Sequence, residues 1–79
     1  MIEVKMPSYG WTETEATIVQ WLKKEGDMVK AEEPLLQIET EKVQVEVQAI
    51  KAGVLRKIMA PEGAKVAVGE VIAIMDEYG

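Results

Sequence analysis

Lys42 is the residue whose type and surroundings best suit covalent chemistry in this chain. It lies in the run Glu39-Thr40-Glu41-Lys42-Val43, between two segments that both have the composition of β-strands. Its primary amine can form a stable amide with a carboxylic acid. If the two flanking segments pair as a hairpin, Lys42 lies at its rigid tip, which would give a modifying enzyme a defined geometry around the nitrogen. The pattern predicts an attachment site at Lys42. A solvated surface lysine is the alternative that the residues alone leave open.

The composition excludes most self-contained catalytic chemistry. The chain has no Cys and no His, which removes thiolate nucleophiles, metals held by Cys or His, and Ser-His pairs. We therefore expect no enzyme activity. The net charge of −5 repels phosphate backbones and anionic lipids, so neither nucleic acid nor a membrane is an expected partner. The absence of cysteine suits a reducing compartment, and we expect a cytoplasmic location.

Short strands must position Lys42. Alternating apolar residues and runs rich in β-branched residues predict six strands, and two very short strands follow glycine turns. The six strands are expected at residues 2–6, 17–22, 35–38, 43–47, 53–58 and 71–75, and the short ones at 28–29 and 65–66. No stretch sustains a helical period. The pattern predicts one all-β domain over residues 1–79, a flattened barrel or sandwich.

The segments that flank Lys42, residues 35–39 and 43–47, form a predicted hairpin. The tip contains no Asn-Gly or Gly-Gly pair, which favours a type I turn over a primed turn. Glu41 and Lys42 would occupy this tip and point into water.

An internal repeat relates the two halves of the chain. The pattern Glu-Gly-x-x-Val-x-x-x-Glu occurs at residues 25–33 and again at 62–70, an offset of 37, and residues 2–5 resemble 45–48 at an offset of 43. Two similar halves predict two sheets related by an approximate two-fold axis. The difference of six residues falls in one surface loop, at residues 8–14.

Several stretches together carry a family resemblance. They are Met6-Pro7 and residues 15–29, 34–42, 53–55, 61–63 and 68–73, and the most specific is Ile38-Glu39-Thr40-Glu41-Lys42-Val43. The chain resembles the lipoyl domain of 2-oxoacid dehydrogenase acyltransferases, in the biotinyl/lipoyl attachment family, whose motif reads Glu-(Thr/Ser)-Asp-Lys-Ala. The resemblance implies that Lys42 carries lipoate in amide linkage. It also implies two four-stranded antiparallel sheets with quasi-two-fold symmetry.

By this resemblance the domain is a swinging-arm carrier. A lipoate-protein ligase or lipoyl transferase would modify Lys42 and recognise Glu39, Glu41 and Val43 around it. The arm would take acyl groups from a thiamine-diphosphate decarboxylase to the catalytic domain of an acyltransferase, and dihydrolipoamide dehydrogenase would reoxidise it. The loop before the second strand would supply the residues that the decarboxylase recognises: Tyr9, Gly10, Trp11 and Thr12.

Six positions depart from the family pattern, and two of them, Tyr9 and Trp11, stand where the family more often has Leu and a small or polar residue. Glu41 replaces Asp and Val43 replaces Ala beside the lysine, while Ala16 and Glu32 stand where glycine is common. If its turn needs a positive φ, Glu32 costs roughly 1 kcal/mol.

Two alternative functions remain beside the lipoyl carrier. One is a biotin carrier domain of a biotin-dependent carboxylase, although biotin carriers usually have Met on both sides of the lysine. The other is an unmodified structural hairpin domain. The acyltransferase motif His-x-x-x-Asp-Gly is absent from the chain, so we expect a domain of a longer acyltransferase subunit.

Overall fold

The described chain consists of β-strands joined by turns. The computed structural model describes residues 1–8 and 14–77. The strands are β1 (Ile2–Lys5), β2 (Glu15–Trp21), β3 (Met28–Val29), β4 (Pro34–Glu39), β5 (Gln44–Gln48), β6 (Gly53–Ile58), β7 (Lys65–Ala67) and β8 (Val71–Glu77). All eight predicted strands are present, with ends that differ by at most two residues. Within the described ranges, no helix is long and apolar enough to cross a membrane.

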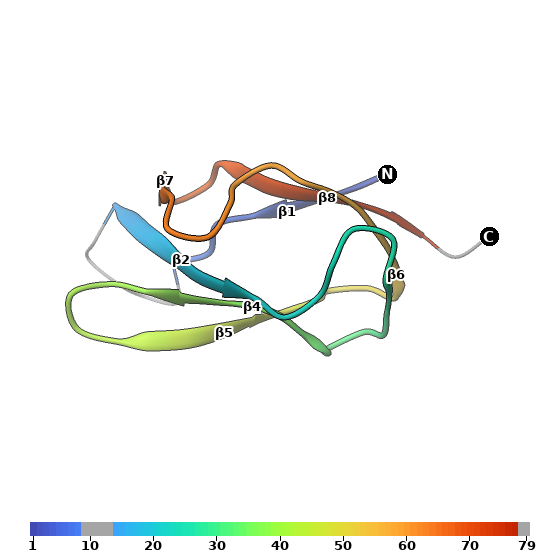
Figure 1. The fold of residues 1–79 in the computed structure, drawn as a ribbon, viewed down its shortest axis with the longest axis horizontal. Helices are drawn as coiled ribbons and strands as arrows, with labels where there is room; N and C mark the ends of the chain where they lie inside the picture. Colours follow the sequence, from blue (N-terminus) through green and yellow to red (C-terminus); the bar gives the residue numbers. More distant parts are fainter. Residues whose placement is uncertain (9–13, 78–79) are drawn as a thin grey trace.

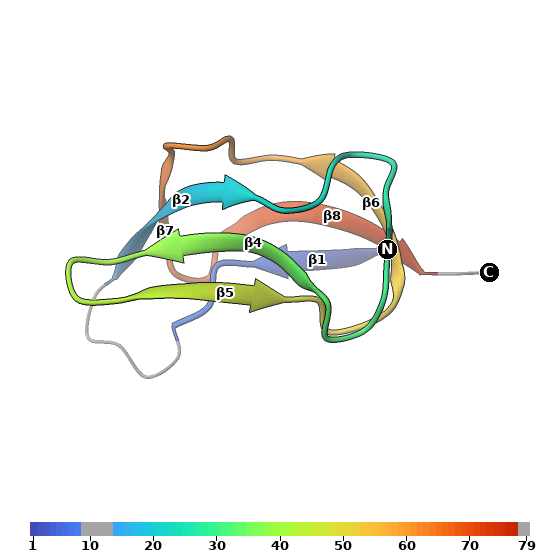
Figure 2. The same cartoon turned by 60° about the horizontal axis from the view of Figure 1, so that its bottom comes forward.

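The strands form two four-stranded antiparallel sheets, as predicted. One sheet has the order β1-β8-β6-β3 and the other β5-β4-β2-β7, and the two face each other as the layers of a flattened barrel (Figure 1, Figure 2). Ile18 and Ile38 from one sheet and Leu55 and Met75 from the other are almost completely buried in a single core cluster. Burial of this apolar surface is the main force that holds the sheets together.

The predicted two-fold relation is present in the strand order. The repeat pairs β2 with β6, β3 with β7, β4 with β8 and β1 with β5, and these pairings convert the order of one sheet into that of the other. Hydrogen bonds between the two halves of the chain repeat as well. The Gly26 amide donates to the Leu55 carbonyl (2.6 Å), and the Gly63 amide donates to the Ile18 carbonyl (2.7 Å).

The repeated glutamates explain why the Glu-Gly pattern occurs twice. The Glu25 carboxylate accepts the Ile58 amide (2.8 Å), and the Glu62 carboxylate accepts the Trp21 amide (3.1 Å). Each side chain therefore ties one half of the chain to the end of a strand in the other half. Trp21 adds an indole hydrogen bond to the Ala60 carbonyl (2.8 Å) and packs against the core.

Glu32 occupies the strained backbone position that its sequence context suggested. Its φ is 69°, and its counterpart in the second half, Gly69, has φ of 93°. The two amides make equivalent bonds, from Glu32 to the Ala49 carbonyl (2.7 Å) and from Gly69 to the Met6 carbonyl (2.9 Å). The turn geometry is thus fixed by the fold in both halves, and only one half has the residue that adopts it without strain.

We expect Glu32→Gly to stabilise the domain. Relief of the left-handed strain exceeds the added entropy of glycine in the unfolded chain, and the net gain should be about 0.5–1 kcal/mol. Urea unfolding would measure the gain as a higher midpoint at unchanged slope. The matched control is Gly69→Ala, which should lower the midpoint. A lower midpoint for Glu32→Gly would contradict this explanation of the turn.

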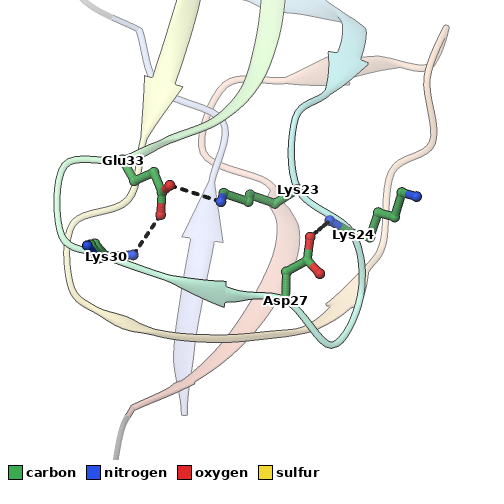
Figure 3. A network of polar contacts seen from close by, with 5 residues as sticks. All are labelled: Lys23, Lys24, Asp27, Lys30 and Glu33. Atoms are coloured by element: carbon green, nitrogen blue, oxygen red, sulfur yellow. Dashed lines mark hydrogen bonds and ion pairs between the residues drawn. The ribbon is translucent and has the colours of Figure 1, made fainter.

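Glu33 joins the turns on either side of β3. One of its oxygens accepts the Lys30 amide (2.9 Å), and the other forms an ion pair with the Lys23 ammonium (2.9 Å) (Figure 3). The Asp27 carboxylate accepts the Lys24 amide (2.8 Å) in the adjoining turn. The Lys30 amide, and after it the bond from Lys23, lower the pKa of the Glu33 carboxyl below its usual value.

This lowered pKa predicts an acid-dependent loss of stability. A carboxyl with a depressed pKa in the folded state stabilises the fold above its usual pKa and loses that contribution as the pH falls through the folded-state value. Glu33→Gln should therefore be less stable than the wild type at pH 7, and the difference should shrink as the pH falls below 4.5. Denaturant unfolding at pH 7 and pH 3 would test it. If the stability difference between the wild type and Glu33→Gln is the same at both pH values, the ionised Glu33 carboxylate is not its source.

Candidate functional site

The β4–β5 hairpin holds Lys42 at one end of the barrel. The two strands are paired from Pro34↔Gln48 to Glu39↔Gln44, and the hairpin tip, residues 40–43, lies at the end opposite the N-terminus (Figure 1, Figure 2). Ile38 is completely buried and anchors the hairpin in the core. The predicted hairpin is confirmed, and its base is rigidly attached to the sheet.

Side-chain hydrogen bonds organise the hairpin tip. The Thr40 amide donates to the Val43 carbonyl (2.8 Å), and the Thr40 hydroxyl accepts the amides of Lys42 and Val43 (3.3 Å each). Among the described non-glycine residues, only Glu32 has a positive φ, so the tip is not a primed turn, as expected. We did not predict this role of Thr40 from the sequence, although a hydroxyl residue at the start of a turn often accepts hydrogen bonds from the amides that follow it.

The predicted site residues Glu39, Glu41, Lys42 and Val43 lie together and are exposed. The Gln44 side-chain amide donates to the Glu39 carboxylate (3.1 Å) across the base of the tip. None of the ion pairs within residues 1–8 and 14–77 involves the Lys42 ammonium. The geometry fits a covalently attached group, because the amine faces solvent and its backbone is held by the turn.

A groove of about 550 Å³ lies beside the hairpin. It opens because the pairing of β2 with β4 ends at Thr17↔Glu39, whereas β6 and β8 stay paired to Gly53↔Glu77 in the other half. The groove carries three carboxylates and one ammonium group. Its lining residues are Thr14, Glu15, Ala16, Thr17, Glu39, Thr40, Glu41 and Lys65.

The predicted recognition loop is only partly described. Tyr9, Gly10, Trp11 and Thr12 lie outside the described residues, so their position relative to the hairpin stays a prediction. Thr14, at the described end of this loop, lines the groove together with Glu39 and Glu41.

Comparison with known proteins identifies the family. A family model described as "Biotin-requiring enzyme" (Biotin_lipoyl) matches residues 2–75. The solution structure of the lipoyl domain of the 2-oxoglutarate dehydrogenase complex from Azotobacter vinelandii superposes with a TM-score of 0.81, at 37% identity and with full coverage of both chains. The chain belongs to the lipoyl domain family. The predicted resemblance and the predicted fold of this lipoyl domain are both confirmed.

The lipoyl domain is also similar to part of several longer acyltransferase components. It is 52% identical over 79 residues to the dihydrolipoyllysine-residue acetyltransferase component of the pyruvate dehydrogenase complex from Zymomonas mobilis, covering 99% of this chain. It is 53% identical over 76 residues to the succinyltransferase component of the 2-oxoglutarate dehydrogenase complex from Rickettsia conorii, covering 96% of this chain. The chain spans 18% and 19% of the lengths of these two relatives.

These comparisons assign a class to the lipoyl domain. It is a non-catalytic carrier domain, and its family implies a covalently attached lipoate or biotin. The relatives are components of 2-oxoacid dehydrogenase complexes, so the biotin alternative is not favoured.

Proposed function

We propose that Lys42 carries lipoate in amide linkage and that the domain is a swinging-arm carrier of a 2-oxoacid dehydrogenase complex. The observation that supports this most directly is the exposed amine at the tip of the anchored β4–β5 hairpin, in a chain of the lipoyl family. When bound, lipoate supplies a dithiolane that accepts an acyl group together with two electrons.

The residues of the domain position the attachment point. The turn holds the Lys42 backbone at the tip of the β4–β5 hairpin, and the exposed side chain makes no ion pair with the described residues. Tethering an arm in this way replaces bulk diffusion with a high effective concentration at each partner site. Amide formation also removes one positive charge, which takes the net charge of the chain from −5 to −6.

The proposal extends to the partners. A lipoate-protein ligase or lipoyl transferase would attach lipoate to Lys42 and recognise Glu39, Glu41 and Val43. The decarboxylase component would contact the hairpin and the loop that contains Tyr9, Gly10, Trp11 and Thr12. The acyltransferase catalytic domain and dihydrolipoamide dehydrogenase would complete the cycle, in the cytoplasm. The names of the relatives, components of two such complexes, support this set of partners.

A head-to-head modification assay tests which group is attached. The purified domain is incubated with ATP and either a lipoate-protein ligase with lipoate or a biotin-protein ligase with biotin, and the intact mass is measured. We expect complete conversion to the lipoyl form and no biotin adduct. A biotin adduct in place of the lipoyl adduct would establish the biotin carrier, and no adduct from either enzyme would leave the structural hairpin domain.

A further inference from the structure

We infer that Thr40 is a positioning residue for the modification of Lys42. Its hydroxyl fixes the hairpin tip in the conformation that the ligase binds. This inference rests on the proposed function, because it assigns a part in the attachment reaction to a side chain that does not itself react.

The Thr40 hydroxyl, and not a backbone carbonyl, accepts the amides of Lys42 and Val43. Two-residue hairpin loops normally use primed turns, whose twist matches that of the strands. Glu41 and Lys42 are not among the residues with positive φ, so the tip closes differently. The Thr40 amide bonds to the Val43 carbonyl (2.8 Å), while the amides of Lys42 and Val43 both bond to the Thr40 hydroxyl (3.3 Å).

The backbone on either side of the Lys42 Cα therefore depends on this one oxygen. Without it, the Lys42 and Val43 amides would turn to water, and the bond between the Thr40 amide and the Val43 carbonyl would still close the tip. Water satisfies exposed amides at little cost in stability, but it does not hold a backbone in one conformation.

Thr40 contributes little to the core. It does not belong to the buried cluster, and its bonds to Lys42 and Val43 are exposed to solvent. The expected loss on removal of the hydroxyl thus concerns the order of the tip and not the fold of the barrel. The ligase would then have to order the tip each time it binds.

The consequence is a rise in KM at unchanged kcat. A tenfold rise corresponds to about 1.4 kcal/mol, which is within the cost of fixing the backbone of a single residue. We expect about a tenfold higher KM for the domain as substrate of the ligase when the hydroxyl is removed. The kcat should stay the same, because the Lys42 amine is unchanged and the bound complex is the same.

Two conservative changes separate the hydroxyl from the rest of the side chain. Thr40→Val keeps the shape and removes the hydroxyl, whereas Thr40→Ser keeps the hydroxyl and removes the methyl group. The initial rate of lipoylation is measured for the wild type and both variants at several domain concentrations, which gives KM and kcat. The temperature is kept well below the melting temperature of each protein. NMR order parameters of the Lys42 and Val43 amides are measured in the same samples.

Thr40→Val should show the raised KM and lower order parameters at both amides, and Thr40→Ser should resemble the wild type. A KM of Thr40→Val within twofold of the wild type would overturn the inference, and so would an equal rise in Thr40→Ser. Failure of the proposed function itself has a different signature, because the wild-type domain would then not accept lipoate at all.

Discussion

Lys42→Arg should abolish lipoate attachment and leave the barrel folded. The guanidinium group keeps the positive charge but does not replace the primary amine in amide formation. Since the side chain is exposed and makes no ion pair with a described residue, its replacement should change stability by no more than about 0.5 kcal/mol. Intact mass after treatment with lipoate-protein ligase measures the loss, and circular dichroism measures the fold.

The control for this prediction is Lys57→Arg. Lys57 is also exposed, but it lies on β6, in the sheet that does not contain the hairpin. This variant should be lipoylated to completion. The loss of lipoylation in Lys42→Arg would then be due to the position of Lys42 and not to the replacement of an exposed lysine in general. A lipoyl adduct on the folded Lys42→Arg variant would contradict the proposed attachment site.

Gly53→Ala should be strongly destabilising. Gly53 is buried at the start of β6 and paired on both sides, with Val29 of β3 and Glu77 of β8. A Cβ at this position would overlap the backbone carbonyl oxygen of Asp76, which the paired strand holds in place. Overpacking of this kind costs about 2–3 kcal/mol. For a domain of this size the melting temperature should fall by roughly 10–20 °C, which thermal unfolding would measure.

The counterpart of Gly53 in the first half provides the control. Ala16 is also buried and pairs with Val66 of β7, but β4 stops pairing with β2 at Thr17, so Ala16 lines the groove beside the hairpin. The Ala16 side chain belongs to the buried core cluster, so the fold accommodates a methyl group at this position. Ala16→Gly should therefore cost about 1–1.5 kcal/mol, through a lost buried methyl and added chain entropy, with no relief of strain. Stabilisation by Ala16→Gly, or tolerance of Gly53→Ala, would refute this account.

The strands and their two-fold relation could be predicted from the sequence because both leave local signals. The alternation of Val45 and Val47 with polar residues predicts a half-buried strand, and the two Glu-Gly patterns predict equivalent turns. The structure adds what each glutamate does, since Glu25 and Glu62 bond to amides in the opposite half of the chain. Contacts at such separations depend on the tertiary fold, and no local pattern encodes them.

The position of Lys42 at a hairpin tip was equally predictable, but the environment of the tip was not. The hydroxyl bonds of Thr40 depend on the exact closure of the turn. The groove beside the hairpin depends on where the pairing of β2 with β4 stops. The sequence predicted strain at Glu32 only if its turn needs a positive φ. Whether it does depends on the path of the folded chain.

The most direct test of the carrier proposal locates the acyl group after one transfer. The lipoylated domain is mixed separately with the decarboxylase component of a pyruvate dehydrogenase complex or of a 2-oxoglutarate dehydrogenase complex, each with its substrate. The domain is then digested and mapped by tandem mass spectrometry. We predict an acyl-lipoyl group from at least one decarboxylase, on the peptide that contains Lys42 and on no other lysine. An acyl-lipoyl group on a different lysine, or a fully lipoylated domain that neither decarboxylase acylates, would contradict the proposal.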